Sequence, residues 1–122
     1  MKIQSLLFDA LSKHVCCKEM LRQAIDTGVC EPSSCLIADE QMCEFGQWLY
    51  SSDCPEEIKV SASYDTTRKV HADFHTAAAE IMKLAEIGEK EQARQMIVEG
   101  NYPIQANNLK REIMNWAQLV PE

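Results

Sequence analysis

The chain has 122 residues and a formal net charge of −7, from 19 acidic and 12 basic residues. This length suits a single domain over residues 1–122, with a hydrophobic core that needs no disulfide support. The acidic balance offers no electrostatic attraction for nucleic acid or for an anionic membrane surface. We therefore exclude nucleic acid and membrane as partners.

The cysteine content predicts reduced thiols. Six cysteines are a smaller share of the chain than disulfide-rich scaffolds contain, and four glycines and four prolines give little loop character. Polar residues from Gln4 onward interrupt any signal-peptide pattern, and no stretch approaches the roughly 20 apolar residues that span a bilayer. We expect a cytoplasmic protein, in which important cysteines bind metal or do redox chemistry.

The first half of the chain is predicted to be helical. Apolar residues at helical spacing predict a first helix over residues 2–27, which Gly28 ends. A loop follows, then a second helix over residues 36–50. A long third helix is predicted over residues 55–87, because Pro55 suits the first turn of a helix.

The second half continues this pattern. Gly88 precedes a fourth helix, which the sequence Gly100-Asn101-Tyr102-Pro103 must kink or break. A last helical run over residues 104–119 ends at Pro121. Because no alternating strand pattern occurs, the sequence predicts an all-α protein, an antiparallel four-helix bundle with a kinked or broken last helix.

Histidine is the least frequent potential metal ligand in the chain, with three residues. His14 falls on the apolar stripe of the first helix, while His71 and His75 form an i, i+4 pair on one helix face. Imidazoles buried without partners cost about 1–3 kcal/mol each, and a shared metal would satisfy all of them. The His71–His75 pair by itself does not require a metal, because the two rings could also be hydrogen-bonded in the core or lie half-exposed.

Cys43 is the cysteine best placed to join such a site. It opens the sequence Cys43-Glu44-Phe45-Gly46-Gln47-Trp48-Leu49-Tyr50, in which Gly46 lowers helix stability. We expect Gly46 to let another helix, or the metal with its ligands, come close. No Cys-x-x-Cys occurs, so the other cysteines are expected to be ordinary free thiols with no assigned role: Cys16, Cys17, Cys30, Cys35 and Cys54.

These residues together resemble a known family. His14, the Cys-x-Phe-Gly-x-Trp-Leu-Tyr element from Cys43, and His71-Ala72-Asp73-Phe74-His75 are similar in order and spacing to the chemoreceptor zinc-binding domain. That bacterial cytoplasmic sensory module has a zinc site of three histidines and one cysteine. The resemblance implies that His14, Cys43, His71 and His75 are the zinc ligands.

A site of this kind is closed, because four protein ligands leave no position for water or substrate on a tetrahedral zinc. We therefore expect a structural or sensory role and no enzymatic activity. Cys43 would supply the one anionic, oxidisable donor, and its oxidation would weaken zinc binding and alter helix packing. The family is implicated in sensing zinc and hypochlorous acid.

The resemblance also implies a signalling partner. Members of the family typically lie at the end of a chemoreceptor or beside a diguanylate cyclase, so we expect this chain to regulate a partner of either type in trans. A homodimer is a further expectation. The dimer interface would use a second apolar face of the bundle, although the same residues could instead complete the core of the monomer: Ile3, Leu6, Phe8, Ile113, Trp116 and Leu119.

Two carboxylates are candidates to accept hydrogen bonds from the ligand imidazoles. Asp39 precedes Cys43 by one helical turn, and Asp73 lies between the two histidines of the third helix; surface positions are the alternative for both.

Other functions compete with the sensor. Zinc could simply hold a structural adaptor bundle together. A small metallohydrolase would need one histidine not to be a ligand, which would open the site to water, yet no motif supplies its base. A di-iron bundle is disfavoured, because three histidines and no Glu-x-x-His element are too few ligands.

Overall fold

The computed structural model of the chain describes residues 3–120, in which every regular element is a helix. The elements in chain order are α1 (Ile3–Val15), α2 (Cys17–Thr27), α3 (Ser34–Ala38), the 3₁₀ turn η1 (Glu40–Met42), α4 (Glu44–Tyr50), α5 (Glu56–Lys59), α6 (Ala62–Glu86), α7 (Lys90–Glu99) and α8 (Asn101–Leu119). The predicted all-α class is confirmed. Within the described range, no helix combines the length and the apolar character needed to cross a membrane.

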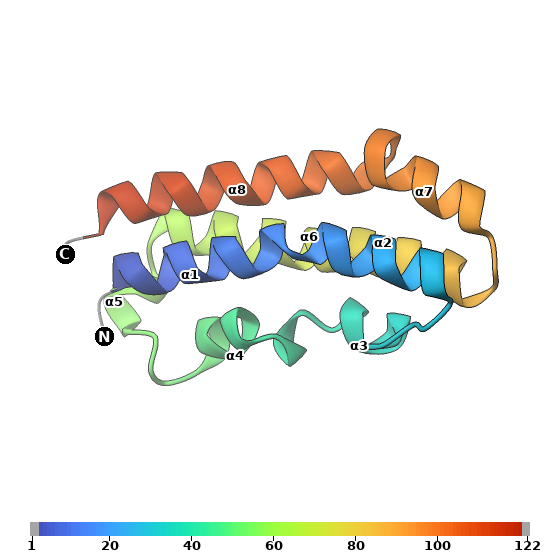
Figure 1. Cartoon of the computed structure of the whole chain (residues 1–122). Coiled ribbons are helices and arrows are strands. Elements are labelled where there is room, and N and C mark those ends of the chain that lie inside the picture. The colour runs from blue at the N-terminus through green and yellow to red at the C-terminus, as the bar shows by residue number, and fades with distance from the viewer. Residues whose placement is uncertain (1–2, 121–122) are drawn as a thin grey trace.

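The helices form four layers, and layers that follow each other along the chain run in opposite directions (Figure 1). α1 and α2 run in line, and α7 and α8 make a second rod that packs beside them. α6 is the long central helix and contacts both rods. Residues 34–50, here called the α3–α4 segment, pack on α6 on the side away from α8. The predicted four-helix bundle is thus confirmed.

The first predicted helix is divided at Cys16. This residue keeps right-handed helical dihedrals, and its carbonyl still accepts a hydrogen bond of 3.2 Å from the N–H of Met20, so the rod continues through the break. Gly28 ends α2 in the left-handed conformation at φ 77°, as predicted, and its N–H donates to the carbonyl of Ala24. The predicted start at Lys2 lies outside the described residues.

The continuous second helix predicted over residues 36–50 is wrong. The backbone is extended at Asp39 and at Cys43, so the segment consists of α3, η1 and α4. Each interrupting residue caps the element that follows it. The Asp39 carboxylate accepts from the N–H of Gln41, and Cys43 Sγ accepts from the N–H of Gly46.

The single third helix predicted over residues 55–87 is wrong, because the structure divides it into α5 and α6, and the last helix begins at Asn101 rather than at the predicted residue 104. Pro55 precedes the short α5, and α6 starts only after Ser61, whose hydroxyl accepts from the N–H of Tyr64. The predicted break at Gly100 separates α7 from α8. The predicted end at Pro121 lies outside the described residues.

The core fills the space between α6 and the surrounding layers. Its largest fully buried apolar side chains are Leu7, Leu21, Ile25, Leu49, Ile81, Met82, Leu109, Ile113 and Trp116. Ile113 and Trp116, considered above for a dimer face, therefore complete the core of the monomer. Ile3 and Leu6 pack partly buried against that core, whereas Phe8 and Leu119 are 46% and 73% exposed.

Candidate metal centre

Four side chains from three layers of the bundle meet at one point. His14 lies in the last turn of α1, Cys43 immediately precedes α4, and His71 and His75 lie on successive turns of α6. One nitrogen or sulfur atom from each lies within 4.8 Å of the others. The structure thus brings together all four residues that the sequence singled out.

The distances within this group match a tetrahedral zinc. The Nε2 atom of His71 lies 3.1 Å from Nε2 of His14 and 3.3 Å from Sγ of Cys43, and Sγ lies 3.9 Å from Nε2 of His14. Zinc–nitrogen and zinc–sulfur bonds of usual length, at tetrahedral angles, separate two nitrogens by about 3.3 Å and nitrogen from sulfur by about 3.6 Å. The donors of His14, Cys43 and His71 are therefore spaced close to the edges of one face of a zinc tetrahedron, and His75 has a donor atom within 4.8 Å of each of them.

Hydrogen bonds orient two of the rings. The Nδ1 of His14 donates to the carbonyl of Ala10 at 2.7 Å, and the Nδ1 of His75 donates to the carbonyl of Ile37 at 2.8 Å. Protonation at Nδ1 leaves the lone pair on Nε2, the atom that binds a metal. The Nε2 atom of His75 is buried and has no hydrogen-bond partner among the described residues, so its lone pair is available to a metal ion.

Neither of the predicted carboxylate acceptors hydrogen-bonds an imidazole of the donor group. Asp39 is exposed and caps η1 through the N–H of Gln41, and Asp73 is exposed on α6. Backbone carbonyls hold the rings of His14 and His75 instead. Sequence reasoning missed them, because every residue carries a carbonyl and none has a distinguishing side chain.

Burial keeps the three imidazoles neutral. It lowers the pKa of His14 from 6.5 to about 4. The pKa of His71 is lowered by burial and, secondarily, by the neighbouring His75 and His14. Burial lowers the pKa of His75 as well. At neutral pH all three rings therefore offer lone pairs and no charge that repels a cation.

Burial also raises the pKa of the Cys43 thiol, against the opposing effect of the Gly46 and Phe45 N–H groups. A metal ion would displace the thiol proton and supply the positive charge that favours a thiolate here.

The backbone around Cys43 is shaped by Gly46. Cys43 Sγ accepts from the N–H of Gly46 at 3.3 Å and lies 3.4 Å from the carbonyl of Glu40, to which its thiol donates. A Cβ atom at Gly46 would stand 1.7 Å from that carbonyl oxygen. The close approach predicted at Gly46 is real, but its partner is the backbone of η1 rather than another helix or the metal.

Two hollows flank the four donors, and both include His14 and Cys43 in their walls. One, of about 580 Å³, lies between α1 and α4 beside Phe45 and Trp48. The other, of about 410 Å³, lies towards α3 beside Leu36 and Ile37. Cys43 therefore borders a hollow on two sides.

The remaining cysteines are all free and none belongs to the four-donor group. Cys16 and Cys35 are exposed, Cys17 and Cys30 are half-buried, and Cys54 is buried in the core. Burial raises the pKa of Cys17 to about 11, although a hydrogen bond with Tyr102 opposes the shift.

The fold and the donor group define a class of protein, a small helical bundle with four potential metal ligands gathered in its interior. A comparison with family models gives the family. The model described as "Chemoreceptor zinc-binding domain" matches residues 14–82, which is more than half of the chain and contains all four donors. The chain belongs to the chemoreceptor zinc-binding domain family. Neither the curated proteins nor the solved structures include a significant match.

Proposed function

We propose that this chain is a cytoplasmic zinc-binding sensory domain, without enzymatic activity, in which His14, Cys43, His71 and His75 hold one zinc ion. The observation that carries the proposal is the convergence of the four donors within 4.8 Å, together with the family match. Four protein ligands saturate a tetrahedral zinc, so the site suits sensing or stabilisation better than hydrolysis.

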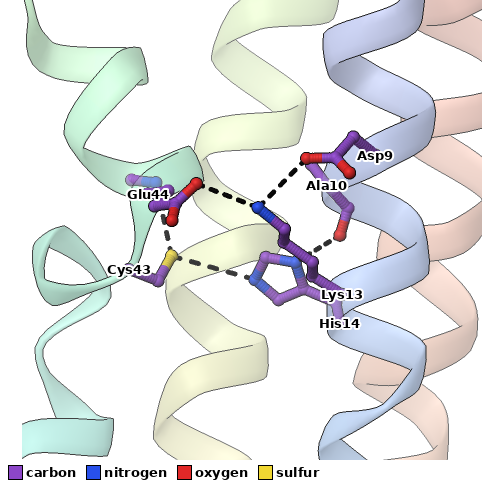
Figure 2. A network of polar contacts seen from close by, with 7 residues as sticks. Asp9, Ala10, Lys13, His14, Cys43 and Glu44 are labelled. Carbon is purple, nitrogen blue, oxygen red and sulfur yellow. Dashed lines mark hydrogen bonds and ion pairs between the residues drawn. The ribbon is translucent and has the colours of Figure 1, made fainter.

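The position of Cys43 supports a role in signalling. Its three partner ligands lie on α1 and α6, whereas Cys43 belongs to the α3–α4 segment. Two polar bridges join α1 to this segment (Figure 2). One is the Cys43–His14 contact, and the other runs from Lys13, paired with Asp9, to Glu44 at 2.9 Å. The second bridge is exposed and adds little stability. Releasing Cys43 from zinc would therefore loosen the segment from α1.

Oxidation is one way to release it. With hypochlorous acid, the Cys43 thiol becomes a sulfenic acid: the sulfur loses two electrons and gains the oxygen, and the chlorine leaves as chloride with a proton. The reaction removes the thiolate from the donor set. The hollow between α1 and α4, which Cys43 lines, would be the route by which the oxidant reaches this residue.

We propose that the altered α3–α4 segment regulates a chemoreceptor or a diguanylate cyclase in trans, and that the domain pairs with a second copy. The exposed apolar side chains of Phe8 and Leu119 support pairing. They lie at the same end of the bundle, where Gln4 of α1 donates to the carbonyl of Ala117 in α8.

Metal analysis of the purified chain tests the zinc site. We expect one zinc per chain, lost in Cys43→Ala and in His71→Ala. Cys35→Ala is the matched control, because Cys35 is exposed and outside the donor group. A native protein without metal, or equal zinc in all variants, would overturn the site.

A second experiment distinguishes an oxidant from zinc as the signal that the domain senses. Zinc-loaded protein is treated with one equivalent of hypochlorous acid, and the modified cysteine is located by mass spectrometry. An oxidant sensor should be modified first at Cys43, with release of zinc. Earlier modification of the exposed Cys16 or Cys35 would contradict oxidant sensing. A response to chelator and added zinc that Cys43→Ser abolishes would identify zinc as the input.

A further inference from the structure

Besides Nε2 of His75, which faces the donor group described above, two more buried polar atoms on α6 have no hydrogen-bond partner, and these two lie one helical turn apart. They are Oγ1 of Thr67 and Nδ1 of His71. Both residues are completely buried, at 0% exposure. A buried polar atom without a partner is rare in a folded protein, and two of them on neighbouring turns of one helix need a common explanation.

The other two histidines each have a hydrogen-bond acceptor at Nδ1, and His71 has none. Nδ1 of His14 donates to the Ala10 carbonyl and Nδ1 of His75 to the Ile37 carbonyl. His71 directs Nε2 towards Cys43 and His14 in the same way, so its ring proton also belongs on Nδ1. A proton there needs an acceptor.

Thr67 lies where that acceptor is required. Side chains four residues apart on a helix stand one above the other, with Cβ atoms about 5–6 Å apart. A threonine hydroxyl can accept one hydrogen bond while it donates its own proton, and a change of side-chain rotamer redirects it. Thr67 and His71 can therefore satisfy each other without movement of the helix.

We propose that Thr67 is a positioning residue for the metal centre: its hydroxyl accepts the Nδ1 proton of His71 and fixes the ring with Nε2 towards the zinc. The inference rests on the zinc site proposed above. Thr67 does not touch the metal. Its effect passes through His71, the one histidine of the three whose ring has no carbonyl to hold it.

The test compares three variants of the full chain. Thr67→Val keeps the shape and removes the hydroxyl, and Thr67→Ser restores the hydroxyl. Thr66→Val makes the same change at an exposed neighbour on α6 and controls for the helix preference of valine. Zinc affinity is measured by competition with a chromophoric chelator, and the metal-free stability of each variant by urea unfolding.

We expect Thr67→Val to weaken zinc binding about 10-fold or more, the usual effect of losing a group that orients a ligand. Thr67→Ser and Thr66→Val should bind zinc as the parent does. The metal-free Thr67→Val protein should be at least as stable as the parent, because the Thr67 hydroxyl pairs with His71 only once zinc fixes the ring and is otherwise buried and unpaired. In zinc-loaded protein, the His71 Nδ1 proton should be visible by NMR and should exchange faster in Thr67→Val.

Equal zinc affinity of Thr67→Val and the parent would overturn the inference and leave the proposed function intact. Parallel losses of zinc affinity and metal-free stability would also overturn it, since a purely structural role produces that result. Absence of zinc from the parent chain would instead refute the zinc site itself, and the inference with it.

Discussion

The Nε2 atom of His71 lies 3.3 Å from the sulfur of Cys43, so the middle of α6 is in direct contact with the start of α4. The α3–α4 segment is held to α6 at this point and at its two ends. Glu86 accepts from the N–H and the hydroxyl of Ser34, and Tyr64 donates to the carbonyl of Leu49. A metal between His71 and Cys43 would tighten the central attachment.

Removal of zinc is therefore expected to loosen the α3–α4 segment more than the rest of the bundle. Hydrogen exchange with and without a chelator measures this for each amide. The N–H of Gly46, which donates to Cys43, should exchange faster without zinc, whereas amides of α8 around the buried Leu109 should change little. Uniform acceleration through both regions would contradict a local effect.

Gly46→Ala is expected to abolish the normal geometry of Cys43. The added Cβ would stand 1.7 Å from the Glu40 carbonyl oxygen, and its nearest neighbours are all backbone atoms of Glu40 and Gln41, which cannot rotate away as a flexible side chain could. Overpacking of this kind costs roughly 1–3 kcal/mol of stability or more. Thermal unfolding and zinc content should both fall. Gln47→Ala, at the exposed next residue of α4, is the control and should leave both unchanged.

Tyr64→Phe tests the attachment at the end of α4. The Tyr64 hydroxyl donates to the Leu49 carbonyl at 2.6 Å in a buried position. The variant leaves that carbonyl unpaired, and we expect a loss of about 1–3 kcal/mol in the free energy of unfolding. Zinc stoichiometry should stay at the parent value, because Tyr64 lies outside the donor group. Loss of zinc in this variant would show that the anchor also shapes the metal centre.

The metal-free protein is expected to lose stability on acidification. The pKa of His14 falls from 6.5 to about 4 in the fold, and burial lowers the pKa values of His71 and His75 as well. The unfolded chain therefore binds protons at higher pH than the folded chain does. Stability is full above about pH 6.5 and decreases as the pH falls towards 4.

Urea unfolding in the presence of a chelator, at pH 7.5 and at pH 5, measures this decrease. Metal-free His14→Gln should depend less on pH over the same interval, since it lacks one of the titrating rings. Equal pH dependence of the two proteins would show that His14 is not responsible.

The three histidines of the proposed zinc site could be singled out from the sequence because histidine is scarce in this chain, whereas the full ligand set with Cys43 came from the resemblance to the chemoreceptor zinc-binding domain. Only three histidines occur, and the positions of His14, His71 and His75 on helical stripes direct them towards one core. The bundle was predictable for a similar reason, since the long helices repeat apolar residues at a constant period and Gly28 and Gly100 interrupt them.

The bends of the α3–α4 segment were not predictable in this way. Leu36 and Met42 fit a helical period, yet both are about half exposed, at 48% and 54%. The segment bends because Asp39 and Cys43 each use a side chain to cap the next turn, and because η1 contacts Gly46. These interactions depend on the folded positions of the groups, which periodicity does not contain.

The positions of the four donors along the chain bear on the order of folding. His71 and His75 share one helix, so they can bind a metal ion together as soon as α6 forms. His14 and Cys43 are separated from His71 by 57 and 28 residues, so a long loop of chain must close before either of them contacts His71. Zinc present during synthesis would therefore be captured first by α6, and α1 and the α3–α4 segment would assemble around an ion already in place.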